Sequence, residues 1–157
     1  FRRVLFRSLE KFTSVSRRAE NLGRIKGVKV TADYAHHPKE LSAALSVLTD
    51  DVKNALVVFQ PHTYSRTRLL MNEFTDVLKT VGKVIIYKTF SAREEYDEEG
   101  SAYTLYNNLK KVSEGEVIYA STPAELKDLL YENCEKTSDI LVLGAGDVYY
   151  LVKKMLS

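Results

Sequence analysis

Residues 55–78 read ALVVFQPHTYSRTRLLMNEFTDVL, an apolar run followed by a helical pattern. The unbroken apolar run from Ala55 to Phe59 is typical of a strand that is buried on both faces. The apolar residues that follow recur every three or four positions and share one side of a helix: Leu70, Phe74, Val77, Leu78 and Val81. This stretch predicts a strand, a loop and a helix that packs against a sheet.

The same alternation continues along the chain. The best-marked helix begins with Thr122 as N-cap, Pro123 in the first turn and Glu125 completing a capping box. Alternating strands and helices imply right-handed crossovers. We therefore expect an α/β fold: a doubly wound, Rossmann-like, mostly parallel sheet with helices on both faces. Further apolar runs predict its other strands at 28–31, 84–87, 117–119 and 140–143.

The N-terminal region is less regular. Residues 14–23 predict an extra strand that pairs with residues 28–33 through a turn at 23–27. Residues 1–8, FRRVLFRS, show no periodicity and resemble translated sequencing-adapter DNA. We treat residues 1–8 as a non-native segment and residues 9–157 as the domain, and we expect a fragment that begins in mid-protein.

The net charge depends on that segment. Without Arg2, Arg3 and Arg7, Lys and Arg fall from 23 to 20 against 21 Asp and Glu, so the formal charge changes from +2 to −1. A nucleic-acid interface needs clustered Lys and Arg on one face. The near-neutral balance therefore argues against a nucleic-acid partner.

Composition excludes several other classes. A chain of 157 residues with 45% hydrophobic and 28% charged residues suits one globular domain. Its single cysteine, Cys134, rules out a disulfide scaffold and a cysteine-based metal site, and it lies on an apolar helical face that predicts burial. The sequence has no run of 18 apolar residues and no signal-peptide pattern, so we expect no membrane partner and a cytoplasmic location.

Three polar segments follow predicted strands: DYAHHP at 33–38, QPHTYSRTR at 60–68 and GAGD at 144–147. In an open α/β sheet, ligands bind beyond the carboxyl ends of the strands. We therefore expect the three segments to meet at one site.

The first segment allows two interpretations. His36 and His37 are adjacent and cannot both point at one ion, and no second ligand cluster accompanies them, so no metal site is expected. The plainer interpretation is a loop leading into a helix, with one histidine capping it and the other solvated. Asp33 could orient a cation or a ribose hydroxyl, or simply form a turn.

The second segment contains two arginines that helical geometry separates. Arg66 lies four residues before Leu70, so it extends the buried stripe into the crevice, whereas Arg68 points roughly 200° away. A guanidinium there suits a carboxylate or a phosphate, and His62 could share that ligand. The alternative is a surface helix with solvated arginines.

The third segment, Gly144-Ala145-Gly146, could let a backbone turn approach a ligand, or be no more than a tight turn. Tyr149 occupies the third-glycine position of G-x-G-x-x-G, so the dinucleotide fingerprint fails. The phosphate-binding sequence G-x-x-x-x-G-K-[ST] does not occur in the chain.

Together the three segments resemble the C-terminal domain of the Mur ligase family of bacterial peptidoglycan synthesis, and the long run at 60–68 resembles its alanine-adding members, the UDP-N-acetylmuramate:L-alanine ligases. The resemblance covers about residues 12–156. Arg17 and Arg18 resemble the arginine pair of the strand that enters that domain. Thr63 departs from the pattern, since many relatives carry arginine there, and leaves the set of carboxylate donors open.

The resemblance implies a three-domain ligase in which ATP phosphorylates the lactyl carboxylate of UDP-N-acetylmuramate and the amine of L-alanine attacks the acyl phosphate. ATP and Mg²⁺ would be bound mainly by a central domain that, like the UDP-sugar domain, lies upstream and outside this sequence, so the chain alone is expected to be inactive. The resemblance assigns no catalytic residue to this chain. By analogy Arg18 and Asp33 face ATP, and the L-alanine side comprises Tyr34, His36, His62, Arg66, Gly144, Ala145 and Gly146.

Two alternatives belong to other classes. A receiver-like signalling domain would share the sheet but should show an acidic cluster after its first strand, where only Asp33 stands. A small His-dependent hydrolase would need a nucleophile and an orienting partner at one strand edge. Turnover by this chain alone would favour the hydrolase.

Overall fold

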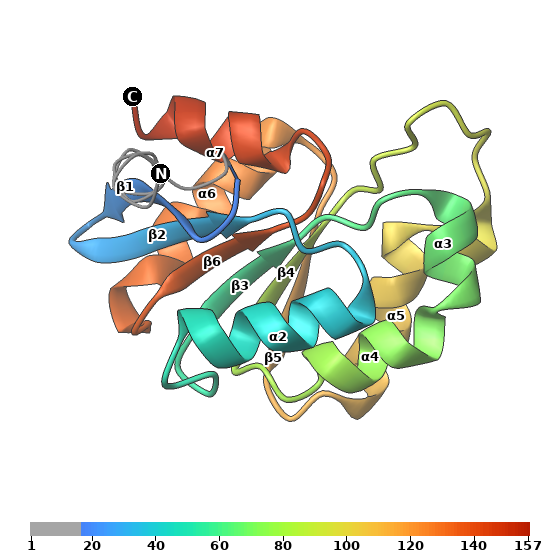
Figure 1. Ribbon diagram of the computed structural model, residues 1–157, viewed down its shortest axis with the longest axis horizontal. Helices are drawn as coiled ribbons and strands as arrows, with labels where there is room; N and C mark the ends of the chain where they lie inside the picture. The colour runs from blue at the N-terminus through green and yellow to red at the C-terminus, as the bar shows by residue number, and fades with distance from the viewer. Residues whose placement is uncertain (1–16) are drawn as a thin grey trace, which may run out of the picture.

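The computed structural model describes residues 17–157 and confirms the α/β prediction (Figure 1). Its sheet has the strand order β1-β2-β6-β3-β4-β5. β1 is antiparallel to β2, and every other neighbouring pair is parallel. The strands are β1 Glu20–Ile25, β2 Val28–Asp33, β3 Leu56–Phe59, β4 Lys83–Tyr87, β5 Glu116–Ala120 and β6 Ile140–Leu143.

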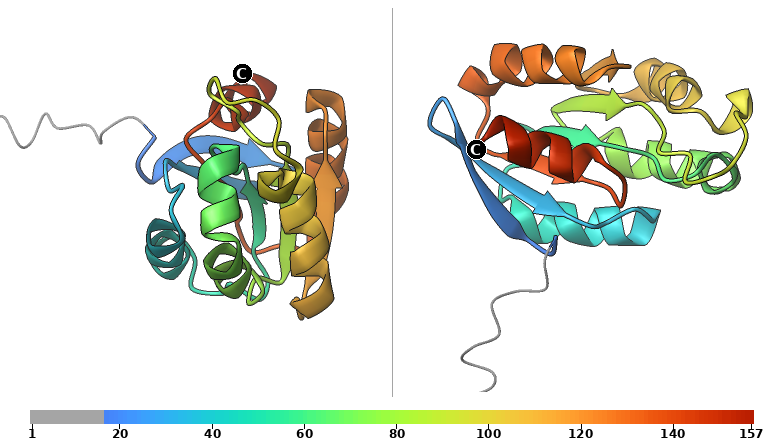
Figure 2. Two further views of the ribbon diagram at one scale, coloured as in Figure 1. Left: turned by 90° about the vertical axis from the view of Figure 1, so that its right-hand side faces the viewer. Right: turned by 90° about the horizontal axis from the view of Figure 1, so that it is seen from above.

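Helices cover both faces of this sheet, as predicted. α2 and α4 lie side by side on one face together with α5, and α6 and α7 lie on the other (Figures 1 and 2). Two short 3-10 turns lie between a helix and a strand: η1 at Glu98–Gly100, between β4 and α5, and η2 at Cys134–Lys136, between α6 and β6. The helices are α2 Pro38–Leu48, α3 Tyr64–Leu69, α4 Met71–Leu78, α5 Ala102–Val112, α6 Pro123–Asn133 and α7 Val148–Met155.

The core is divided by the sheet into two layers. Along β3, Leu56 and Val58 point into the cluster beneath α6 and α7, while Val57 and Phe59 point into the cluster beneath α2, α4 and α5. All four are fully buried, as an interior parallel strand requires. Cys134 is likewise buried in the first cluster, which confirms the prediction for it.

The helix expected to continue through Arg66 and Leu70 is broken, and this part of the prediction is wrong. Leu70 has φ −112° and ψ 22°, so α3 ends just before it and α4 begins just after it. α3 packs against η1, where a side chain on Gly100 would collide with the carbonyl of Tyr64. α4 packs against the sheet instead, so the two helices need separate directions. Within α3 the buried residue is Thr67 rather than Arg66.

The extra N-terminal strand exists, but its boundaries differ from the prediction. β1 covers Glu20–Ile25, and residues 14–16 of the predicted strand lie outside the described residues, as does the segment 1–8. The chain reverses at Lys26 and Gly27, both with positive φ, which is the geometry of a tight hairpin. Gly23 therefore lies inside the strand, at a β-bulge, and not at the turn.

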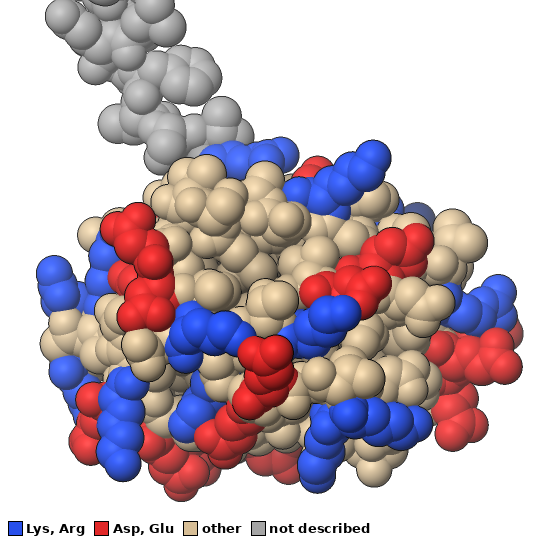
Figure 3. Space-filling view, turned by 90° about the horizontal axis from the view of Figure 1, so that it is seen from below, with Lys and Arg blue, Asp and Glu red and all other residues tan. Residues whose placement is uncertain are grey.

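The surface is mixed in charge. On the face shown in Figure 3, Lys and Arg side chains are interspersed with Asp and Glu. No helix within residues 17–157 is both long and apolar enough to cross a bilayer.

Candidate functional site

The three polar segments meet at the carboxyl edge of the sheet, because the strands before them, β2, β6 and β3, are neighbours. The amide of Gly144 donates to the carbonyl of Asp33 at 3.1 Å, and the amide of Gln60 donates to the carbonyl of Leu143 at 3.0 Å. The rings of His36 and His62 lie 5.7 Å apart between centroids. The predicted convergence of the three segments is confirmed.

A row of aromatic rings crosses this edge. Tyr34 meets His36 edge-on at 5.2 Å, and His62 stacks on Phe90 at 5.3 Å with an interplanar angle of 20°. The His36–His62 contact joins these two pairs into one row. Phe90 was missed by the sequence reasoning, although its position just after β4 was a usable signal.

The two arginines of α3 have different partners, as the predicted 200° separation requires. Nη1 of Arg66 donates to Nδ1 and to the backbone carbonyl of His62, at 3.3 and 3.2 Å. Arg68 pairs with Asp97 at 3.1 Å and lies 4.0 Å from Glu99. Nε and Nη2 of Arg66 make no hydrogen bond with the described residues, so its fork can still bind an anion.

The surroundings of His62 favour its neutral form. Burial lowers its pKa, and the charges of Arg66 and His36 lower it further. A guanidinium can only donate, so Nδ1 of His62 accepts from Arg66 and the ring proton resides on Nε2. His62 therefore offers an N–H donor to a ligand.

His36 has the opposite arrangement. Its Nδ1 lies 3.0 Å from the carbonyl oxygen of Tyr34, which can only accept, so Nδ1 carries the proton. Nδ1 also lies 3.4 Å from Oε2 of Glu40. In the neutral ring Nε2 is left as an acceptor. The expectation of a solvated second histidine is wrong, since His36 is half-buried in the aromatic row.

His37 is the N-cap of α2. Its Nδ1 accepts from the amide of Lys39 at 3.4 Å, and Oε2 of Glu40 accepts from the amides of His36 and His37 at 3.0 and 3.2 Å. This is the capping role expected for one of the two histidines. Burial raises the pKa of Glu40, but the amide and the charge of His36, the amide of His37 and the charge of Arg18 outweigh this effect and leave that pKa lowered.

Asp33 forms the turn that the plainer interpretation expected. Oδ1 accepts from the amide of Ala35 at 2.9 Å, and Oδ2 accepts from the amide of Ala19 at 3.0 Å. It also lines a cleft of about 270 Å³ together with Arg18 and Glu40. The rest of that cleft is formed by Ala19 and by the α2 residues Ala43, Ala44, Val47 and Leu48.

The glycine turn after β6 is tightly packed. Gly144 has φ +145°, which favours glycine, and a Cβ on Gly146 would collide with Oε1 of Gln60 and lie 2.7 Å from Cβ of Phe90. The amides of Gly144 and Val148 already donate to Asp33 and Gln60. Packing alone therefore requires these glycines, as the tight-turn interpretation expected.

Arg17 joins the chain leading into β1 to this turn. Its Nη2 donates to the carbonyl of Gly146 at 2.6 Å, and its guanidinium lies over the rings of Tyr34, Tyr149 and Tyr150 at 4.8, 4.9 and 5.2 Å. Sequence reasoning named Arg18 as the ligand-facing member of the pair and gave Arg17 no role. The structure places Arg17 within the site's framework and Arg18 on the neighbouring cleft.

The acidic loop before η1, residues 94–97, fixes the start of α3. Glu94 accepts hydrogen bonds from the amide and the hydroxyl of Ser65, and these bonds lower its pKa. Thr63, the residue that departs from the family pattern, has φ +49°, a strained conformation for a β-branched side chain. The loop thus supports the candidate site.

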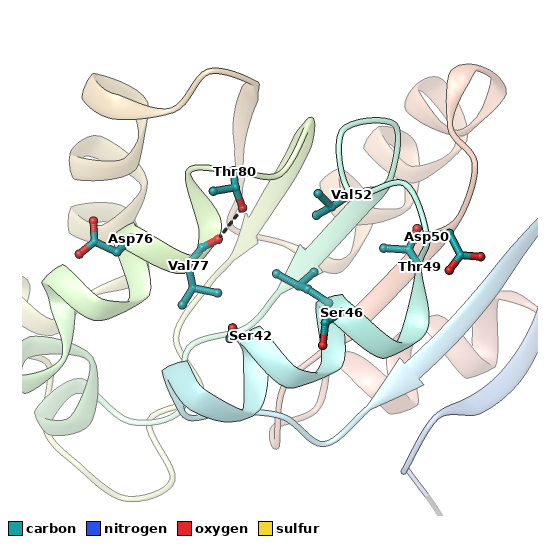
Figure 4. Close-up of a pocket in the computed structure, with 9 residues that line it drawn as sticks. Ser42, Ser46, Thr49, Asp50, Val52, Asp76, Val77 and Thr80 are labelled. Carbon is teal, nitrogen blue, oxygen red and sulfur yellow. Dashed lines mark hydrogen bonds between the residues drawn. The ribbon is translucent and has the colours of Figure 1, made fainter.

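A larger hollow of about 420 Å³ lies elsewhere, between the C-terminal parts of α2 and α4 (Figure 4). Ser42 and Ser46 come from α2, while Asp76 and Val77 come from α4. None of the three sequence motifs contributes a lining residue. We therefore centre the candidate site on the motifs and not on this hollow.

Comparison with known proteins agrees with these motifs. The family model for the glutamate ligase domain of Mur ligases matches residues 17–146. The UDP-N-acetylmuramate--L-alanine ligase of Lachnospira eligens is 39% identical over 149 residues, covering 94% of this chain and 32% of that protein. The enzyme of the same name from Alkaliphilus metalliredigens is 36% identical, covering 98% and 33%. The chain thus spans about a third of the length of these curated relatives.

Solved structures share the fold. The UDP-N-acetylmuramate-alanine ligase of Thermotoga maritima superposes with a TM-score of 0.67 at 21% identity, over 98% of this chain and 34% of that one. A murein peptide ligase from Psychrobacter arcticus gives a TM-score of 0.70 at 14% identity, over 96% and 31%. These findings do not favour a receiver-like domain or a hydrolase. The chain belongs to the Mur ligase family, in which it is the C-terminal, glutamate ligase domain.

Proposed function

We propose that this chain is the amino-acid-binding, closing domain of an ATP-dependent ligase that joins L-alanine to UDP-N-acetylmuramate. The observation that carries the proposal is the Arg66 guanidinium, half-buried beside the row of Tyr34, His36 and His62. The names of the relatives that match nearly the whole chain support the same substrates.

The carboxylate of L-alanine would bind Arg66. One terminal nitrogen of the guanidinium is used on His62, which fixes the orientation of the group. The remaining N–H groups can donate two parallel bonds to a carboxylate. His62, neutral and protonated on Nε2, adds a donor without adding a charge.

The amine of L-alanine must be neutral and held in line to attack an acyl phosphate. The Nε2 lone pair of His36 can accept a hydrogen bond from that amine. The Gly144–Gly146 turn borders the site, and closure of this domain onto the rest of the ligase would exclude water that hydrolyses the acyl phosphate. Selection of alanine over larger amino acids is then steric, because a methyl group supplies little binding energy.

ATP would lie on the other side of Asp33, in the cleft lined by Arg18, Asp33 and Glu40. Arg18 is exposed and suits a phosphate. Within residues 17–157, no group of three or more His, Cys, Asp or Glu side chains could hold a metal ion. From the resemblance to Mur ligases, we assign Mg²⁺ mainly to the central domain of the full-length ligase. We assign the ligase to the cytoplasm.

Kinetics on the full-length ligase that carries this domain would test the proposal. Loss of a hydrogen bond to a charged group costs roughly 1.5–3 kcal/mol, so Arg66→Ala should lower kcat/KM for alanine by about 10-fold to 150-fold. The KM for UDP-N-acetylmuramate should stay nearly unchanged, because Arg66 is assigned to alanine alone.

Arg68→Ala is the matched control, since Arg68 lies on the same helix but pairs with Asp97. It should cost less than Arg66→Ala. Equal losses from the two variants, or a loss confined to UDP-N-acetylmuramate, would show that Arg66 does not bind the alanine carboxylate.

A further inference from the structure

Gln60 is a fully buried polar residue at the centre of the site's loops. Its Nε2 donates to Oδ1 of Asp147 at 2.7 Å and to the carbonyl of Lys88 at 3.2 Å, and its Oε1 accepts from the amide of Val148 at 3.0 Å. Both N–H donors and the carbonyl of the amide are thus engaged. One side chain ties the end of β3 to the residue after β4 and to the start of α7.

These contacts connect two parts of the candidate site. His62 follows Gln60 by two residues and stacks on Phe90, which itself follows Lys88 by two residues. Gly146 precedes Asp147 and packs so closely on Gln60 that no side chain fits between them. The position of the Gln60 amide therefore sets the spacing between His62 and the glycine turn.

We propose that Gln60 is a positioning residue that fixes His62 and the Gly144–Gly146 turn in the geometry that receives L-alanine. This rests on the proposed function. The side chain does more than fill space: an apolar residue of similar volume would leave the amide of Val148 and the carbonyl of Lys88 without their partner. The loops would then be free to separate.

The first test uses the 157-residue chain itself. In Gln60→Met the stacking of His62 on Phe90 should loosen, so the NMR resonances of the His62 ring should shift. His37 caps α2 and has no contact with this network, so its ring resonances should stay in place and serve as an internal control. His62 resonances that do not move would overturn the proposal.

The second test measures steady-state kinetics of the full-length ligase. Because small displacements of positioning groups have large effects, Gln60→Met should raise the KM for alanine by about 10-fold or more while the KM values for ATP and UDP-N-acetylmuramate stay unchanged. Thr49→Val is the matched control: Thr49 is a buried hydroxyl that bonds Asp139 at 3.0 Å, near the hollow at the far end of α2. It should lower stability without changing the KM for alanine.

A third test changes the charge at position 60 but keeps the shape of the side chain. Gln60→Glu places two carboxylates at the 2.7 Å contact with Asp147 and should raise the KM for alanine. Adding Asp147→Asn restores a donor and an acceptor there, so the double variant should recover part of the loss. A double variant no better than Gln60→Glu would contradict the positioning role.

Arg66→Ala separates the two possible failures. If it weakens alanine binding and Gln60→Met does not, the positioning role of Gln60 is wrong and the proposed function stands. If Arg66→Ala leaves alanine binding unchanged, the alanine site itself is wrongly placed.

Discussion

At the scale of the residue, the charge state of His62 is open to direct measurement. Burial, Arg66 and His36 all favour its neutral form, so its pKa should lie below the ordinary 6.5. An NMR titration of the His62 ring in the 157-residue chain would give that value. Arg66→Ala removes one cause and should raise the pKa toward 6.5. A His62 that titrates above 6.5 in the unsubstituted chain would contradict the neutral form assigned to it.

The lowered pKa of His62 also predicts how folding stability changes with pH. Between the lowered folded pKa and 6.5, the unfolded chain binds a proton at His62 that the folded chain does not. Folding stability should therefore fall as the pH drops through 6.5, until the folded His62 protonates as well. His62→Gln should remove this part of the pH dependence of unfolding.

Single residues differ in how well the sequence predicts them. The capping role of His37 was within reach, because a cap depends on the next few residues. The role of Gln60 was not, since its partners lie 28 and more residues away and meet it only in the folded sheet. Arg17 was missed for the same reason: its contact with Gly146 spans 129 positions.

At the scale of the element, α6 begins with a full capping box. Oγ1 of Thr122 accepts from the amide of Glu125, and the Glu125 carboxylate accepts from the amides of Ser121 and Thr122. Thr122→Ala should destabilise the domain by about 1 kcal/mol, measured by urea unfolding. Lys127→Ala, at an exposed position of the same helix, is the control and should change little. Equal effects would mean that the cap contributes nothing.

Strands and helices were predicted well where they depend on a local sequence pattern. They were predicted badly where the direction of a helix depends on a partner far away in the sequence. The apolar runs placed the five parallel strands, because an apolar run is a local feature of the sequence. It is clearest in β3, β4 and β6, which are almost wholly buried. The break at Leu70 was invisible, since the spacing of Leu70, Phe74 and Leu78 continues through it. Only the docking of α3 on η1 explains the change of direction.

At the scale of the whole molecule, the 157-residue chain should not hydrolyse ATP. Its sequence contains no phosphate-binding P-loop, and in the proposed ligase the other domains supply that loop. Phosphate release by the purified chain should stay at the level of buffer alone, while the full-length ligase, given its substrates, releases phosphate. Robust hydrolysis by the chain alone would contradict the proposed division of labour among domains.

The strand order has a consequence for how the molecule is made. β6 lies between β2 and β3, yet it is the last of the six described strands in chain order. Until it emerges, no strand pairing joins the hairpin β1-β2 to the set β3-β4-β5. His36 and His62 belong to different pieces. A chain that ends before Ile140 therefore lacks the strand that joins the two halves of the candidate site.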